Sequence, residues 1–221
     1  LSQAGLIATS DPRTAQMTQL LDTQNGGDAG DRRVVSRFQL LRLLGEGGLG
    51  NVWLARDEKL NRNVAIKELN ANALKSPAAW RRFQREAEIT GRLEHPNIIS
   101  LYQYGDDRDT GEPFYAMRFV GLRTLADAIS EYHDRMEAGE DAALGLHRML
   151  AVFLDVCQAI AYAHSRGVVH RDLKPENVAL DRFGEVVVLD WGLAKLIEDG
   201  EFIQKMSTEA NLSDSSLHQT M

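Results

Sequence analysis

The sequence predicts an α+β fold, in which an antiparallel β-sheet with one inserted helix is followed by a helical half. Strand-like segments separated by turns occupy residues 37–120. One helix interrupts them and begins at Ser76-Pro77, because serine is a common N-cap and proline is favoured at the first helical position. Two further helices are predicted at 124–136 and 147–165.

Turns divide the first half into strands. Residues 37–44 and 52–55 are strand-like on either side of a glycine-rich turn, and a strand at 63–67 follows. A second pair of strands, at 98–104 and 114–120, is joined by a polar turn. Such short connections are typical of an antiparallel sheet.

The helix at 147–165 carries a largely apolar stripe. Its members recur at the 3.6-residue spacing of a helix with one buried face, at positions 150, 153, 154, 157, 160, 161 and 164. We expect this stripe, including Cys157, to belong to the core of the helical half.

Composition excludes several classes of function. The 221 residues carry a formal charge of −7, with an isoelectric point near 5.4, and no basic block is present, so nucleic acid is not expected as the main partner. The single cysteine cannot form an internal disulfide, which indicates a reducing, cytoplasmic location. We expect no membrane segment, because no apolar run reaches spanning length and no signal peptide is visible.

Residues 168–177 carry the most information about chemistry. Their sequence, V-V-H-R-D-L-K-P-E-N, places Asp172, Lys174 and Asn177 at fixed short spacing on a turn. Phosphoryl transfer from ATP needs a carboxylate that receives the hydroxyl proton, a cation for the moving phosphoryl group and an oxygen donor for Mg²⁺. The segment resembles the catalytic loop of the protein kinase family in its Ser/Thr form.

A glycine-rich segment lies upstream of this loop. A G-x-G-x-x-G pattern also occurs in dinucleotide-binding folds, where it opens a helix, but here a strand follows it. Two strands joined by a glycine turn form a flap whose N–H groups can face phosphates. The flap residues that we expect to contact ATP are Leu44, Gly45, Glu46, Gly47, Gly48, Leu49, Gly50 and Val52.

Lys67 ends the strand at 63–67 and, by resemblance, holds the α- and β-phosphates of ATP. A cation in a partly buried cleft needs an anion, because an unpaired buried charge is costly. Glu86, on the inserted helix, is the predicted partner, since the family's glutamate has a similar Arg-Glu-Ala setting. Glu88 is the alternative.

By resemblance, residues near the junction of the two halves bind the adenine. Met117 is the gatekeeper behind the ring, Val120 belongs to the hinge, and Val52 and Ala65 cover the ring from above. Ala179 lies below the ring, where the family often has a larger residue, so a shallower floor is expected.

An apolar strand at 186–189 leads to Asp190-Trp191-Gly192. Mg²⁺ prefers oxygen ligands, with one or two carboxylates plus substrate phosphates, and Asp190 with Asn177 meets this need. The segment resembles the family's Asp-Phe-Gly, with Asp190 as the main metal ligand. Trp191 departs from the pattern, and we expect it to fill the same apolar slot.

The resemblance gives a domain organisation. We expect a flexible leader at 1–36, with a local helix around 14–21 as the alternative, then the sheet lobe and hinge at 37–120. A partial helical lobe at 121–195 precedes the start of an activation segment, expected to be disordered, at 196–221. The chain begins with leucine and stops before the family's remaining helices, so we expect a fragment with an exposed apolar patch over 147–165, low stability and little activity.

The function implied by the resemblance is that of a bacterial Hanks-type Ser/Thr protein kinase, which transfers the γ-phosphoryl of Mg-ATP to a hydroxyl on a protein substrate. A nucleotide-binding pseudokinase or scaffold is the first alternative, although every charged catalytic position is filled. A small-molecule kinase is the second, against which Arg171 and the Lys-Pro-Glu after Leu173 argue. Dimerisation and autophosphorylation of the full-length protein stay open.

Arg171, next to Asp172, suggests regulation. A cation there is costly to leave unpaired, and a phosphate on the activation segment would satisfy it. The candidate hydroxyls are Ser207, Thr208, Ser213, Ser215, Ser216 and Thr220; the alternative is that they are ordinary loop residues.

Overall fold

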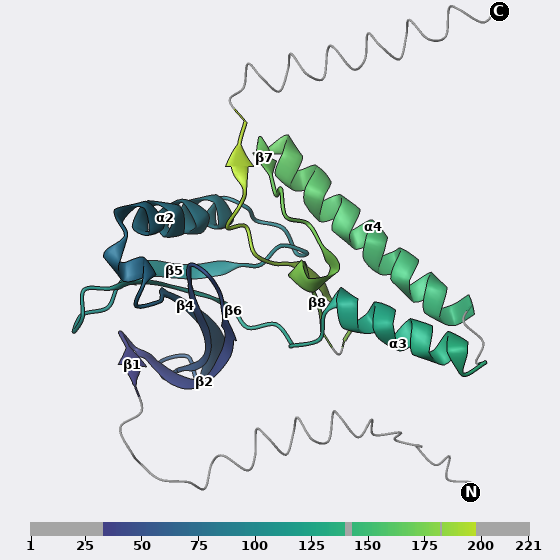
Figure 1. Cartoon of the computed structure of the whole chain (residues 1–221), viewed down its shortest axis with the longest axis horizontal. Coiled ribbons are helices and arrows are strands. Elements are labelled where there is room, and N and C mark those ends of the chain that lie inside the picture. The colour runs from purple at the N-terminus through teal and green to yellow at the C-terminus, as the bar shows by residue number, and fades with distance from the viewer. Residues whose placement is uncertain (1–32, 140–142, 182, 198–221) are drawn as a thin grey trace, which may run out of the picture. The chain divides into compact units, whose positions relative to one another are not determined.

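Six antiparallel strands form the predicted sheet, in the order β1-β2-β3-β4-β6-β5 (Figure 1). The computed structural model describes residues 33–139, 143–181 and 183–197. The expectations for residues 1–32 and 198–221 lie outside this part of the chain. The strands are β1 Val34–Val35, β2 Phe38–Glu46, β3 Gly50–Asp57, β4 Arg62–Leu69, β5 Leu101–Asp106 and β6 Pro113–Arg118.

The ends of two predicted segments need correction. The predicted leader extends to residue 36, but β1 pairs with β2 across a tight turn at Ser36, and Val35 is buried. At the other end, β10 (Lys195–Leu196) pairs with β7 (Val168–Val169), so the predicted disordered segment starts too early. Strands of two residues show no alternation that a sequence pattern can detect.

The pair of strands that closes the sheet is shorter than predicted. The strand expected at 98–104 begins at Leu101, because Ile98 forms a parallel bridge with Val188 of the other half. Its partner β6 ends at Arg118, and residues 119–123 connect the sheet to the helical half. The predicted hinge is therefore a connecting segment and not part of a strand.

Helix α2 (Pro77–Gly91) begins where the sequence predicts. The Ser76 side chain accepts a hydrogen bond from the Ala79 N–H, at 3.3 Å, and proline occupies the first turn. The helix follows a short 3₁₀ turn, η2 (Ala73–Lys75). Its inner face, which includes Phe83 and Ala87, packs with Leu69 and Tyr115 of the sheet. This packing fixes where Glu86 points.

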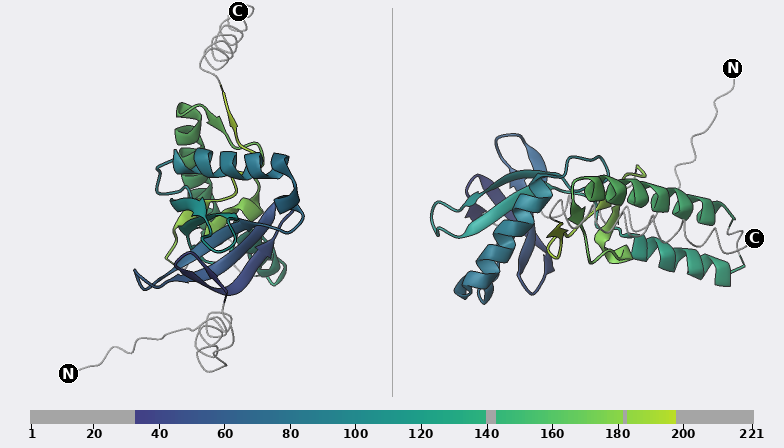
Figure 2. Two further views of the ribbon diagram at one scale, coloured as in Figure 1. Left: turned by 90° about the vertical axis from the view of Figure 1, so that its left-hand side faces the viewer. Right: turned by 90° about the horizontal axis from the view of Figure 1, so that it is seen from above.

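The helical half consists of α3 (Leu125–Glu137) and α4 (Ala143–Ser165), which lie side by side (Figures 1 and 2). A capping box formed by Thr124 and Asp127 starts α3, as its N-terminal sequence favours. After α4 come β7, the 3₁₀ turn η3 (Pro175–Asn177), and a hairpin of β8 (Val178–Leu180) and β9 (Val186–Val188).

The apolar stripe of α4 is exposed. Leu150, Phe153 and Leu154 are 51%, 60% and 60% exposed, whereas the buried residues of this helix are Val156, Ala159 and Ala163. The expected exposed patch is confirmed. The prediction that the stripe belongs to the core of the helical half is wrong for these three residues and for Cys157, which is exposed as well. Periodicity identifies an apolar face but does not say which partner covers it.

A membrane criterion also selects α4. The helix has 23 residues and contains an 18-residue stretch with a mean hydropathy of 1.4, so by length and composition alone it could span a bilayer. The sequence pattern did not indicate a segment that meets this criterion, and the expectation that the chain has no membrane segment stays a prediction. Core helices meet the same criterion, which on its own is weak.

We expect polar substitution of the exposed face of α4 to reduce self-association. A variant with Leu150→Gln, Phe153→Gln and Leu154→Gln removes exposed apolar surface, which otherwise drives association. Sedimentation velocity should show a smaller average species than for the wild type, with the unfolding temperature nearly unchanged.

Val156→Gln is the matched control for that variant. This side chain is buried, so the substitution should destabilise the chain by about 2 kcal/mol or more without reducing association. An equal degree of association in the triple variant and the wild type would contradict the prediction.

Candidate active site

A buried ion pair joins the sheet to α2. The Lys67 ammonium, on β4, lies 2.5 Å from Oε1 of Glu86, and the two side chains are 14% and 2% exposed. The predicted partnership is confirmed. The alternative residue, Glu88, instead accepts a hydrogen bond from Gln84 on the exposed side of the helix.

Tyr115 is a third member of this pair that the sequence did not indicate. Its hydroxyl donates to the same Glu86 oxygen at 2.6 Å. Burial, followed by the charge and hydrogen bond of Glu86, raises the pKa of Tyr115 well above its ordinary value. A tyrosine within the apolar strand β6 has the appearance of a core residue, so nothing local marks its role.

The predicted catalytic residues gather in one loop. The Lys174 ammonium lies 2.9 Å from Oδ2 of Asp172. The amide nitrogen of Asn177 donates to the Asp172 carbonyl at 2.9 Å and to Oδ2 at 3.3 Å. Its amide oxygen is therefore directed away from Asp172.

Hydrogen bonding sets the protonation of this loop. The hydrogen bond from Lys174 is the main cause that lowers the pKa of Asp172, with smaller contributions from Asn177 and His170. The same contact with Asp172 raises the pKa of Lys174, and the charges of Glu176 and Asp190 add to it. The carboxylate and the ammonium therefore favour each other's charged forms.

Backbone contacts tie the loop to the segment that follows β9. The N–H of Leu189 donates to the Asn177 carbonyl at 2.8 Å, and His170 Nε2 lies 2.9 Å from the Leu189 carbonyl oxygen. Asp190 comes next and has a φ of 53°, in the left-handed region, as does Arg171 at 65°. Such conformations are uncommon outside glycine and cluster at functional sites.

Gly192 connects the two parts of the site. A Cβ atom there would lie 3.0 Å from Oε2 of Glu86 and 3.1 Å from Oδ1 of Asp190. The two carboxylates thus flank the same glycine, which joins the Lys67–Glu86 pair to Asp190. Within the described residues no three His, Cys, Asp or Glu side chains gather in a group that could hold a metal ion. Asn177 and Asp190 carry the kind of oxygen atoms that Mg²⁺ prefers as ligands.

Trp191 fills an apolar slot, as expected. It is 1% exposed and belongs to the core cluster of the helical half, with its ring centroid 4.6 Å from that of His170. Its Nε1 has no hydrogen-bond partner among the described residues. A buried tryptophan usually finds such a partner. Burial of the indole N–H of Trp191 without one costs free energy that a phenylalanine at this position would not.

The predicted adenine contacts share one face of the sheet. In the register of β3, β4 and β6, Val52 is opposite Lys67, and Ala65 is opposite Met117. Paired residues and their second neighbours along a strand lie on the same face. Met117 and Val120 also pack against the core of the helical half, which includes the buried Ala179.

The glycine-rich flap is held by a residue that the sequence did not indicate. The side-chain nitrogen of Asn70 donates to the carbonyls of Gly47 and Gly48 at 3.0 and 3.3 Å, and the Asn70 N–H reaches the carbonyl of Leu49 at 3.3 Å. The turn is thereby fastened to the end of β4. The remaining predicted flap residues, Leu44, Gly45 and Glu46, form the end of β2 and are half-buried or exposed.

The glycines of the flap differ in what a Cβ atom would meet. A Cβ on Gly50 would lie only 2.0 Å from the Glu68 carbonyl oxygen, whereas no described atom lies within 4 Å of a Cβ on Gly45 or Gly48. Neither of these two has a positive φ. Packing against Glu68 thus explains Gly50. Neither packing nor a positive φ explains the other two glycines, and the space beside them is free for a ligand.

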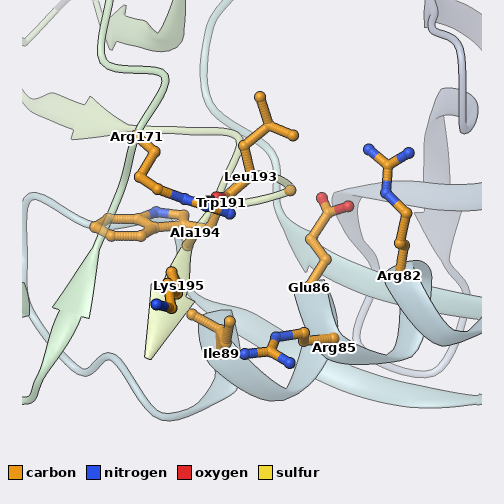
Figure 3. A pocket seen from close by; sticks show the side chains of 10 residues that line it. Arg82, Arg85, Glu86, Ile89, Arg171, Trp191, Leu193, Ala194 and Lys195 are labelled. Atoms are coloured by element: carbon orange, nitrogen blue, oxygen red, sulfur yellow. Dashed lines mark hydrogen bonds between the residues drawn. The ribbon is translucent and has the colours of Figure 1, made fainter. Parts of the chain in front are cut away.

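A pocket of about 340 Å³ lies between α2 and residues 191–195 (Figure 3). Arg82 and Arg85 line it from α2, and Arg171 and Lys195 from the other side. The Nε of Arg171 donates to the Leu193 carbonyl at 2.6 Å. These cations favour an anion, but the hydroxyls proposed for phosphorylation lie outside the described residues, so that hypothesis is untested.

Comparison with known proteins agrees with this geometry. Residues 38–214 match a family model described as protein kinase domain. Over 164 residues the chain is 43% identical to a protein named serine/threonine-protein kinase PknD from Protochlamydia amoebophila, covering 73% of this chain and 16% of that protein. Proteins of the same name from Chlamydia pneumoniae and Chlamydia muridarum are 37% and 35% identical, over 72% and 79% of this chain. The chain spans less than a fifth of the length of these relatives.

Alanine substitutions should separate the two kinds of flap glycine. We expect Gly50→Ala to destabilise the chain by about 2 kcal/mol, because its Cβ meets the backbone of β4. Gly48→Ala is the matched control and should leave the urea midpoint unchanged or slightly higher. Equal midpoints for the two variants would contradict the proposed distinction.

Titration should show the effect of Lys174 on Asp172. We expect a pKa below the ordinary 3.8 for the wild-type carboxyl, and a rise towards 3.8 in Lys174→Met, because the main cause of the lowering is removed. The ion pair between Lys174 and the Asp172 carboxylate is fully present above pH 3.8. It is lost as the pH falls through the lowered pKa of Asp172. Carbon NMR of labelled aspartate measures this.

The conservative Lys174→Arg variant serves as the control, since it keeps a cation within reach and should keep the pKa low. A pKa that does not respond to Lys174→Met would show that other groups hold the carboxylate.

Proposed function

Because the chain belongs to the protein kinase family, we propose that the protein phosphorylates serine or threonine hydroxyls of other proteins, with ATP as the phosphoryl donor. One observation carries the proposal. The Lys67–Glu86 pair, Asp190 and the Asp172–Lys174–Asn177 loop, although distant in sequence, are linked side by side through Gly192 and Leu189.

The chemical step would use Asp172 and Lys174. As the hydroxyl oxygen attacks the γ-phosphorus, Asp172 takes the proton, the bond between that phosphorus and the β–γ bridging oxygen breaks, and ADP leaves. Like any aspartate with a pKa of 3.8 or below, Asp172 is ionised at neutral pH, and in that form it would accept a hydrogen bond from the hydroxyl and orient it. Lys174, beside it, would neutralise charge on the transferring group.

ATP would lie between the flap and this loop. Lys67 is held by Glu86 on the sheet face that also carries Val52, Ala65 and Met117, which suits contact with phosphates at one end and the adenine at the other. Asn177 and Asp190 would hold Mg²⁺, which neutralises phosphate charge when bound. The flap glycines leave room for the phosphates.

Two features refine the proposal. The cationic pocket around Arg171 supports regulation by a phosphate on the segment that follows residue 195.

The free Cys157 supports a cytoplasmic location. A pseudokinase remains the alternative function, because a complete set of charged residues does not guarantee turnover.

A transfer assay with radiolabelled ATP tests the proposal. The full-length protein should label a protein mixture but not small alcohols such as choline, and Asp172→Asn should lower the rate by about 10²–10⁴-fold through loss of the base. Asp134→Asn, on the exposed side of α3, is the matched control and should have no effect.

Each other outcome selects a different function. Labelling of small alcohols alone would support a small-molecule kinase, and ATP binding without transfer would support a scaffold. Mass spectrometry of the same sample locates phosphate on the protein itself; none beyond residue 195 would refute the regulatory hypothesis.

A further inference from the structure

We propose that Tyr115 is a positioning residue, whose hydroxyl fixes Glu86 and, through it, sets Lys67 against the phosphates of ATP. The inference rests on the proposed function. It assigns a role to a side chain that lies outside the flap, the strand at 63–67, the catalytic loop and Asp190-Trp191-Gly192.

A single carboxylate oxygen is the shared acceptor. Oε1 of Glu86 lies 2.6 Å from the Tyr115 hydroxyl and 2.5 Å from the Lys67 ammonium. Tyr115 and Lys67 are directly opposite each other in neighbouring strands β6 and β4, so their side chains leave the same face of the sheet. Two donors from adjacent strands thus fix one oxygen that α2 supplies.

The ring of Tyr115 has little freedom to move. It is 3% exposed and packs 5.1 Å, centroid to centroid, from Phe83, which lies on α2 about one turn before Glu86. Leu69, Ala73 and Ala87 complete the cluster. The hydroxyl therefore has a fixed position relative to both the sheet and the helix.

The hydroxyl acts as a donor throughout the neutral pH range. Burial and the Glu86 carboxylate both disfavour its ionised form, so the proton stays on the tyrosine. The other Glu86 oxygen has no hydrogen-bond partner among the described residues. Without Tyr115, a buried carboxylate would therefore depend on Lys67 alone.

Packing does not require the hydroxyl. A phenylalanine would fill the same space, while a buried hydroxyl costs free energy unless it is hydrogen-bonded. The bond to Glu86 offsets that cost. The Tyr115 hydroxyl contacts Glu86, which orients Lys67. Removal of the hydroxyl should therefore lower the affinity for a nucleotide with phosphates more than the affinity for a nucleoside.

Calorimetric binding of Mg-ATP and of adenosine to the full-length protein tests this. We expect Tyr115→Phe to weaken Mg-ATP about ten-fold, as for one lost hydrogen bond to a charged group, and to leave adenosine affinity unchanged. Tyr104→Phe is the matched control. Its ring centroid also lies near that of Phe83, at 6.5 Å, but the residue is 43% exposed. In the described part of the chain the side-chain donors to the Glu86 carboxylate are Lys67 and Tyr115, and Tyr104 is not one of them. Tyr104→Phe should change neither affinity.

A double variant distinguishes a positioning role of Tyr115 from a role in packing. In Lys67→Met, the added Tyr115→Phe change should cause no further loss of Mg-ATP affinity, because the lysine through which it acts is gone. Three results for Tyr115→Phe would overturn this inference and leave the proposed function intact. They are an equal loss of affinity for Mg-ATP and adenosine, a loss of Mg-ATP affinity in the Lys67→Met background as large as in the wild type, and no change in either affinity. A wild-type protein that does not bind Mg-ATP would overturn the proposed function, and this inference with it.

Discussion

The ion pair between Lys67 and Glu86 is the contact on which the rest of the site depends. It is buried, and a buried charge pair is stable only if its geometry is good and its remaining groups are satisfied. The pair forms because α2 presents Glu86 on the same face as Phe83 and Ala87, which pack on the sheet. Apolar packing thus sets the position of the helix, and the helix sets the position of the charge.

The second half of the site is built differently, from backbone contacts. The N–H of Leu189 donates to the Asn177 carbonyl, and the carbonyl of Leu189 lies within hydrogen-bond distance of His170 Nε2. These two contacts hold the catalytic loop and the segment after β9 in one relative position. Asp190 follows directly, in a left-handed conformation. The two halves then meet at Gly192, where any side chain would press on both carboxylates.

Residues within motifs could be predicted, and residues that support them from elsewhere could not. Lys67, Glu86 and the Asp172 loop were identified because their chemistry goes with a fixed local spacing. Tyr115 and Asn70 act through contacts across 29 and 23 positions in the chain, and neither has a local pattern to mark it. For the same reason the stripe on α4 was recognised as apolar, while its exposure depended on which elements cover it.

The fold explains one glycine of the flap and leaves two others unexplained. A glycine is required where φ is positive or where another atom comes too close for a Cβ atom. Gly50 meets the second condition, because the carbonyl of Glu68 occupies the space. Gly45 and Gly48 meet neither, although they sit beside it in the same turn. At those two positions the fold leaves the place of a Cβ atom free, which is compatible with a ligand that lies against the backbone of the flap.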